Sequence, residues 1–184
     1  GRAYAVDGPE AAPLDMYLES KGLTLAGILH THTHGDHIGL NRTLEQEGRL
    51  AKLRVWGHPD TDVPGRTDPV NEGDTVEIQG LTGDVFLTEG HINGHICFLF
   101  DDVLFSGDTL FAGGCGYLFD GPPPKMWASL TRLAKLPEHT RVCCAHEYTQ
   151  DNLRFARFLE PDNAALAERM KNVWKIRAEG GSTV

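Results

Sequence analysis

A cluster of side chains of the kind that bind metals, between an apolar strand segment and a helical segment, constrains this chain more than any other feature. Residues 32–37 read His-Thr-His-Gly-Asp-His, which puts three imidazoles and one carboxylate within six residues. The run before them, Leu25–Leu29, is apolar without alternation, as in a strand buried on both faces, and Ile38–Arg49 after them has a helical pattern. The cluster is therefore expected at the edge of an α/β sheet where ligands usually bind.

The remaining patterns predict an α/β fold, and 184 residues suffice for one domain with a small appendage. Thr75–Ser106 contains short β-branched or aromatic runs separated by glycines, which indicates an antiparallel meander. Gly113–Pro124 ends in three consecutive prolines and is expected to be an ordered loop or a lid. The other predicted strands are Ala3–Val6, Leu53–Gly57 and Arg141–Ala145, and the other predicted helices are Pro9–Lys21, Lys125–Lys135, Thr149–Glu160 and Asp162–Glu179, the last with Asp162 as its N-cap.

Composition argues against several classes of partner. Lysine and arginine number 17 and aspartate and glutamate 26, which gives a formal charge of −9. Nucleic acids and anionic membranes are polyanions that such a chain repels, so neither is an expected partner. No apolar run is long enough to span a bilayer and no signal segment opens the sequence, so we expect a soluble, cytoplasmic protein. The four cysteines have no Cys-x-x-Cys spacing and are expected to be reduced.

Three more ligand-type residues stand alone at the ends of predicted strands. His95 starts an apolar strand, Asp108 ends another, and His146 ends a third. Imidazole and carboxylate are the usual ligands of borderline divalent metals. The sequence therefore offers seven donors, enough for two metal ions and too many for one: His32, His34, Asp36, His37, His95, Asp108 and His146.

The order of these residues resembles that of the metallo-β-lactamase superfamily. Within it, Gly107-Asp108-Thr109-Leu110-Phe111, Gly114-Cys115-Gly116 and His146-Glu147-Tyr148-Thr149 are most similar to glyoxalase II, the hydroxyacylglutathione hydrolases. The resemblance implies an αββα sandwich, with two mixed sheets flanked by helices. It also implies a catalytic domain over residues 1–148, followed over 149–184 by the start of a truncated C-terminal helical domain.

The resemblance also implies a role for each donor: His32, His34 and His95 hold the first metal, Asp36, His37 and His146 hold the second, and Asp108 bridges both. Asp36 and Asp108 would be the catalytic carboxylates. The expected cofactors are two divalent ions per chain, with zinc ahead of iron or manganese. Such ions lower the pKa of a bridging water towards 7, and the resulting hydroxide would attack a thioester such as S-lactoylglutathione. The family pattern gives His91 the role of supporting its loop without binding metal.

The chain departs from glyoxalase II at the expected glutathione contacts. After the Gly-Cys-Gly motif that family usually places a basic residue and, two positions on, a tyrosine, whereas this chain has Tyr117 and Phe119. Tyr148 is retained and could donate a hydrogen bond to the substrate. Relative to the family, an opening β-hairpin is missing before Ala3 and most of the helical domain after Val184. This is expected either of a fragment or of a natural short relative with a more open site.

Three other functions fit the same residues. A persulfide dioxygenase-like enzyme would hold one iron through His32, His95 and Asp108. A lactone or β-lactam hydrolase would use the same two-metal centre with another leaving group. A module truncated at both ends could instead be inactive or store metal, and its exposed hydrophobic surface would make it aggregate or dimerise. For the hydrolase we expect a small-molecule thioester substrate and a monomer or weak homodimer.

Several further residues are expected to be structural. His30 lies within a strand and should be buried, whereas His58 and His139 lie in polar loops and should be solvated. Trp127 has the helical spacing of a core residue. Cys143–Cys144 falls in a strand that we expect to be buried.

Overall fold

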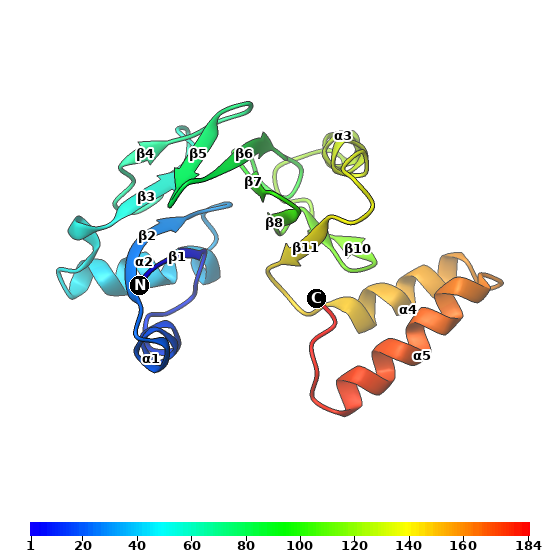
Figure 1. Cartoon of the computed structure of the whole chain (residues 1–184). Coiled ribbons are helices and arrows are strands. Elements are labelled where there is room, and N and C mark those ends of the chain that lie inside the picture. Colours follow the sequence, from blue (N-terminus) through cyan, green and yellow to red (C-terminus); the bar gives the residue numbers. More distant parts are fainter.

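The structure is a computed structural model that describes all residues from 1 to 184, and the chain forms two main β-sheets that pack against each other (Figure 1). The first sheet contains β1 (Arg2–Val6), β2 (Thr24–Leu29), β3 (Arg54–Gly57) and β4 (Asp68–Pro69), in that order and all parallel. Parallel neighbours need crossover connections. α1 (Ala12–Lys21) connects β1 to β2, α2 (Gly35–Gln46) and a 3-10 turn at Leu50–Lys52 connect β2 to β3, and a loop over residues 58–67 connects β3 to β4.

The second sheet contains the predicted meander. Its strands are β5 (Thr75–Ile78), β6 (Leu81–Leu87), β7 (Ile96–Phe100) and β8 (Val103–Gly107), each antiparallel to the next. A fifth strand, β11 (Arg141–Cys144), pairs in parallel with β8 and forms the edge of the sheet. A small ribbon of β9 (Leu110–Phe111) and β10 (Gly114–Cys115) follows β8, and α3 (Pro123–Leu133) precedes β11.

Alternate residues of β2 serve two hydrophobic clusters, because successive side chains of a strand point to opposite faces. Ile28 packs with Leu40 of α2 on the outer face, whereas Leu29 packs with Phe98 of the second sheet. On the far face of the second sheet, Leu133 of α3 joins a third cluster. The layers are therefore helix, sheet, sheet and helix, which confirms the predicted αββα sandwich.

The last two helices, α4 (Thr149–Leu159) and α5 (Ala164–Ala178), form a hairpin that projects from the sandwich (Figure 1). Asn152 of α4 donates from its side-chain amide to the carbonyl oxygen of Ala112, 3.2 Å away, and this bond ties the hairpin to the β9–β10 ribbon. None of the helices combines the length and the apolar character that a membrane span requires.

Two helix starts differ from the predictions. α2 begins at Gly35 rather than Ile38, so Asp36 and His37 lie in its first turn, where a carboxylate interacts favourably with the helix dipole. α5 is capped by Asn163, whose side chain accepts a hydrogen bond from the backbone of the third helical residue, and not by Asp162.

Three burial predictions are wrong, and each has a local cause. His58 is buried, because its Nε2 lies 3.2 Å from Asn71 Oδ1 and its Nδ1 accepts a backbone N–H. Trp127 is exposed, because α3 packs through the face that carries Met126 and Leu133, and Trp127 lies on another face. Cys143 is exposed, because β11 is an edge strand. His30, by contrast, is fully buried as predicted.

Candidate metal centre

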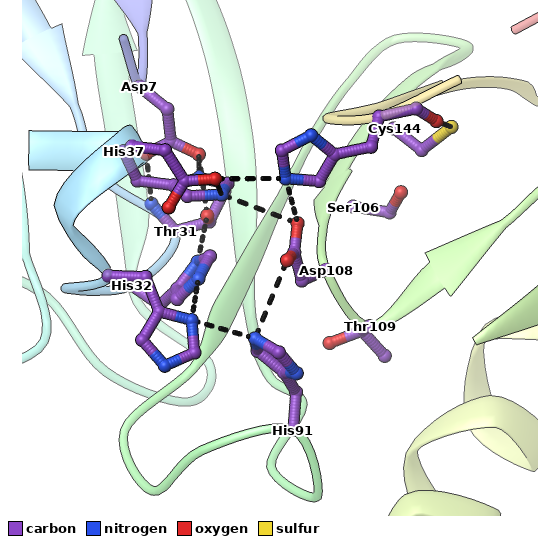
Figure 2. A network of polar contacts seen from close by, with 12 residues as sticks. Asp7, Thr31, His32, His37, His91, Ser106, Asp108, Thr109 and Cys144 are labelled. Carbon is purple, nitrogen blue, oxygen red and sulfur yellow. Dashed lines mark hydrogen bonds and ion pairs between the residues drawn. The ribbon is translucent and has the colours of Figure 1, made fainter. Parts of the chain in front are cut away.

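Imidazole and carboxylate side chains meet where the carboxyl ends of four strands approach the start of α2. His32 follows β2, His91 follows β6, Asp108 follows β8 and His146 follows β11. Figure 2 shows His37, Asp108 and His91 pointing towards one another from these different elements. Ligands bind at this edge of α/β sheets because several loops meet there.

The first group of donors consists of three histidines and Asp108. His34 Nδ1 lies 3.1 Å from His32 Nε2 and 3.0 Å from His91 Nε2. His91 Nε2 lies 3.4 Å from Asp108 Oδ2. All four candidate ligand atoms lie within 4.8 Å of one another, which is close enough to surround one ion.

The second group consists of Asp36, His37 and His146, whose ligand atoms also lie within 4.8 Å of one another. His146 Nε2 is 3.2 Å from Asp36 Oδ2. The other carboxylate oxygen of Asp108, Oδ1, faces this group at 3.4 Å from His37 Nε2 and 3.5 Å from His146 Nε2. Asp108 therefore presents one oxygen to each group.

Hydrogen bonds behind the centre determine which nitrogen of His32, His37 and His91 faces it. The Thr31 hydroxyl donates to Asp7 Oδ2 (2.6 Å), so its oxygen accepts from His32 Nδ1 (3.0 Å). His37 Nδ1 donates to the same carboxylate oxygen (2.9 Å), and His91 Nδ1 donates to a backbone carbonyl (2.6 Å). Carboxylates and carbonyls only accept, so the hydrogen lies on Nδ1 and Nε2 is directed towards the centre.

The charge state of the first group suits a cation. Burial lowers the pKa of His32 and of His91, so both rings are neutral at pH 7. Their two Nε2 lone pairs face His34 Nδ1, which can offer at most one hydrogen between them. Nitrogen lone pairs directed at one point are satisfied by a metal ion.

The second group contains buried atoms that lack partners. His37 Nε2 and Asp108 Oδ1 are both buried without a hydrogen bond. Although burial lowers it, contacts with Asp108 and Asp7 raise the pKa of His37 to about 10. A proton on that ring therefore occupies the place that a cation would take. Histidine and aspartate donors of this kind fit a divalent ion of the zinc class.

The structure does not bring His95, a predicted metal ligand, into either group of donors. Its ring is fully buried, and both ring nitrogens are used by protein groups: Nε2 accepts from Asp108 N at 3.1 Å, and Nδ1 lies 3.1 Å from two threonine hydroxyls. His91, for which the sequence predicted only a supporting role, lies beside His34 in the first group instead. The signal was available, because His95 directly precedes the buried run of β7, whereas His91 lies in a loop with glycines at 90 and 94.

Sequence reasoning also missed Asp7 and Thr31. Asp7 follows β1 with a left-handed backbone (φ 55°) and accepts from Thr31 N, the Thr31 hydroxyl and His37 Nδ1. Contacts with His30 and His37 outweigh its burial and hold the pKa of Asp7 well below its usual range. Only the pairing of β1 with β2 brings this carboxylate behind the ligands.

Exposed aromatic side chains surround the centre. The Phe119 ring lies 5.1 Å from that of His34, with the Tyr117 ring 4.8 Å beyond it. The Tyr148 ring stacks on His146 at 5.1 Å. These three predicted substrate contacts are all solvent-exposed. A cavity of about 510 Å³ opens on the other side, lined by Asp36, His37 and His146 and by residues of β1 and β11.

Comparisons with known proteins agree with this geometry. Residues 6–146 match the metallo-β-lactamase superfamily, and residues 147–184 match the family described as hydroxyacylglutathione hydrolase C-terminus. A hydroxyacylglutathione hydrolase of Pseudomonas fluorescens is 45% identical over 184 residues, which are 100% of this chain and 71% of that protein.

Two solved structures are similar as well. ETHE1 from Myxococcus xanthus has a TM-score of 0.68 and 30% identity, over 80% of this chain and 66% of that one. TTHA1623 in a di-iron-bound form has a TM-score of 0.62 and 31% identity, over 77% of this chain and 80% of that one. The chain therefore belongs to the metallo-β-lactamase superfamily and, within it, to the hydroxyacylglutathione hydrolases.

Proposed function

We propose that this protein is a two-metal thioester hydrolase that cleaves S-2-hydroxyacylglutathione thioesters such as S-lactoylglutathione. The observation that carries the proposal is the placement of Asp108, which directs Oδ2 to one group of histidines and Oδ1 to another. A carboxylate in this position can hold two ions side by side. The name of the Pseudomonas fluorescens relative supports the choice of substrate.

Two donor sets are proposed for the ions. His32, His34 and His91 would hold the first, Asp36, His37 and His146 the second, and Asp108 both. When bound, two such ions lower the pKa of a shared water and polarise the substrate carbonyl. Zinc is the proposed metal, and iron is its main alternative because TTHA1623 is known in a di-iron-bound form. Manganese also suits such donors.

The other protein groups around the centre have separate proposed roles in substrate binding and catalysis. Asp36 is half-exposed and lies beside His146, so it can face an incoming substrate. Tyr148, Tyr117 and Phe119 are proposed to contact the substrate, since all three are exposed at the rim. The leaving thiolate has a pKa near 8.5, so it can depart without a general acid. Because the nucleophile would be the water activated by the two ions, no serine or cysteine nucleophile is needed.

The domain division is proposed in the same way. Residues 1–148 would form the catalytic unit and residues 149–184 the start of a helical unit. In support, α4 and α5 contact each other, and Asn152 links them to the ribbon beside the centre.

The test combines elemental analysis of the purified protein with a thiol-release assay on S-lactoylglutathione. We expect two zinc-class ions per chain and thiol release. Two ions without thiol release would indicate that the substrate is a lactone or a β-lactam instead of a thioester. A single iron together with oxygen uptake would replace the hydrolase with a persulfide dioxygenase-like activity. Size-exclusion chromatography of the same sample tests the proposed monomer or weak homodimer.

A further inference from the structure

His95 is a buried histidine in contact with the centre that takes no part in the proposed ligand sets. Its Nε2 lies 3.1 Å from the backbone nitrogen of Asp108. A backbone N–H can only donate, so Nε2 must be the acceptor and the ring hydrogen must lie on Nδ1. Nδ1 then donates to the hydroxyl oxygens of Thr88 and Thr109, each 3.1 Å away.

The chain of hydrogen bonds continues in one direction beyond these threonines. The Thr109 hydroxyl donates to the Thr88 carbonyl (3.0 Å), which leaves the Thr88 hydroxyl free to donate to Cys97 Sγ (3.1 Å). The Cys97 thiol in turn donates to the carbonyl of Ser106 (3.5 Å). Burial raises the pKa of this thiol to about 12, so it keeps its hydrogen at neutral pH.

The path of bonds returns to the segment from which it started. It leaves from the backbone of Asp108 and ends on the carbonyl of Ser106, two residues earlier at the end of β8. Thr88, His95, Cys97, Ser106 and Thr109 are all fully buried. Each hydrogen in the path has an acceptor, and such directed networks hold a backbone in one arrangement. Ser106, Asp108 and Thr109 are labelled on this segment in Figure 2.

The His95 ring also supports the centre by direct packing. It stacks on the ring of His32, with centroids 4.9 Å apart and an interplanar angle of 24°. The backbone of Gly107 passes so close that a Cβ there would lie 2.8 Å from His95 Nε2. The imidazole therefore fits between one histidine of the first donor group and the chain that carries the bridging carboxylate.

We propose that His95 is a positioning residue, which holds the backbone of Asp108 by accepting its N–H and holds the ring of His32 by stacking. This assignment rests on the metal-binding roles proposed above for Asp108 and His32. A neutral side chain that accepts at one end and donates at the other is what this position requires. Replacing a residue that orients a metal ligand typically weakens metal binding by about 10- to 100-fold.

The test compares His95→Gln, which keeps an acceptor and a donor, with His95→Leu, which keeps neither. His139→Gln and His139→Leu make the same changes at an exposed histidine and serve as controls. We measure zinc stoichiometry after dialysis, zinc affinity by chelator competition, and hydrogen exchange of the amides of residues 107–109. None of these readouts depends on the substrate, so a failure of the proposed hydrolase activity would be seen separately in the wild-type protein.

We expect His95→Leu to weaken zinc binding on the order of 10-fold or more and to speed exchange of the Asp108 amide. His95→Gln should keep most of the wild-type zinc affinity and most of the protection of the Asp108 amide, and it should still bind two ions per chain. With S-lactoylglutathione, kcat should fall in the leucine variant more than KM rises. Loss of one ion in His95→Gln, as expected of a ligand, would overturn the proposal. Equal affinity and exchange in all variants would overturn it too. If His95→Leu fails to fold, the zinc stoichiometry of His95→Gln alone tests the proposal.

Discussion

His91 Nε2 lies 3.4 Å from Asp108 Oδ2, so the loop after β6 and the end of β8 meet at one point of the centre. His91 is held there from behind, since its Nδ1 donates to the carbonyl of Tyr117 at 2.6 Å. The same loop that displays an exposed aromatic side chain thus fixes the orientation of a proposed ligand.

His91→Gln should therefore bind one ion per chain, whereas the wild type is expected to bind two. The variant removes an imidazole from the first donor group and leaves Asp36, His37 and His146 unchanged. Elemental analysis after dialysis measures the difference, with His139→Gln as the control for an exposed histidine. Two retained ions would show that His91 is not a ligand.

Asp108→Ala should lose both ions and all hydrolysis above background, because the carboxylate faces both donor groups. Removing it also leaves His37 without one of the three carboxylates that lie within 4 Å of its ring nitrogens. Metal content and thiol release are measured on the same sample. A normal metal content in this variant would contradict the bridging role.

Asp7→Asn should weaken metal binding by about 10-fold or more, as is common when a group that orients ligands is replaced. Asp7 accepts three hydrogen bonds, from Thr31 N, the Thr31 hydroxyl and His37 Nδ1, and an amide NH₂ would face one of these donors. Chelator competition gives the affinity, and Asp62→Asn at an exposed loop residue is the matched control. An affinity equal to that of the control would exclude the role of Asp7.

Tyr117→Lys should lower KM for S-lactoylglutathione by up to about fivefold, the range expected of an exposed ion pair with a substrate carboxylate. Tyr117 is exposed at the rim beside Phe119, so a lysine there can reach the substrate. Added salt should reduce the gain. Phe158→Lys adds the same charge at an exposed aromatic of α4 and should leave KM unchanged. An unchanged KM in Tyr117→Lys would place the glutathione contact elsewhere.

Glu147 should make stability depend on pH in the acid range. Burial alone would raise its pKa, but the hydroxyl and N–H of Thr183, which donate to it at 2.6 and 2.7 Å, lower the pKa to about 2 from 4.5. A group whose pKa is lower in the folded state stabilises the protein above its unfolded pKa and loses that contribution as the pH falls. The contribution is therefore full above about pH 4.5 and declines towards pH 2.

Glu147→Gln should be less stable than the wild type by about 2 kcal/mol at pH 7, the size expected of hydrogen bonds to a charged group. The difference in the free energy of unfolding between the variant and the wild type should narrow as the pH falls below about 4.5. Urea unfolding from pH 7 to pH 3 measures it, with Glu138→Gln as an exposed control. A gap that stays constant over this range would mean that the charge of Glu147 contributes nothing.

The sequence alone determined the αββα class and most of the donor residues, because both depend on local pattern. The unalternating apolar run of Leu25–Leu29 is typical of a strand covered on both faces, and the structure covers it with α2 and the second sheet. His32, His34, Asp36 and His37 follow within a few residues of its end, so any fold that buries the strand brings them together.

Only the tertiary structure shows that His91, and not His95, lies among the other donors, and only it revealed Asp7. The two histidines are four residues apart in one glycine-containing segment. They differ in position because His95 directly precedes β7 and is fully buried at the start of that strand, whereas His91 lies in the preceding loop. Asp7 reaches the centre through the pairing of β1 with β2, which joins residues more than twenty positions apart. Contacts between distant segments depend on which strands pair and how the sheets pack, and the pattern within a single segment does not determine this.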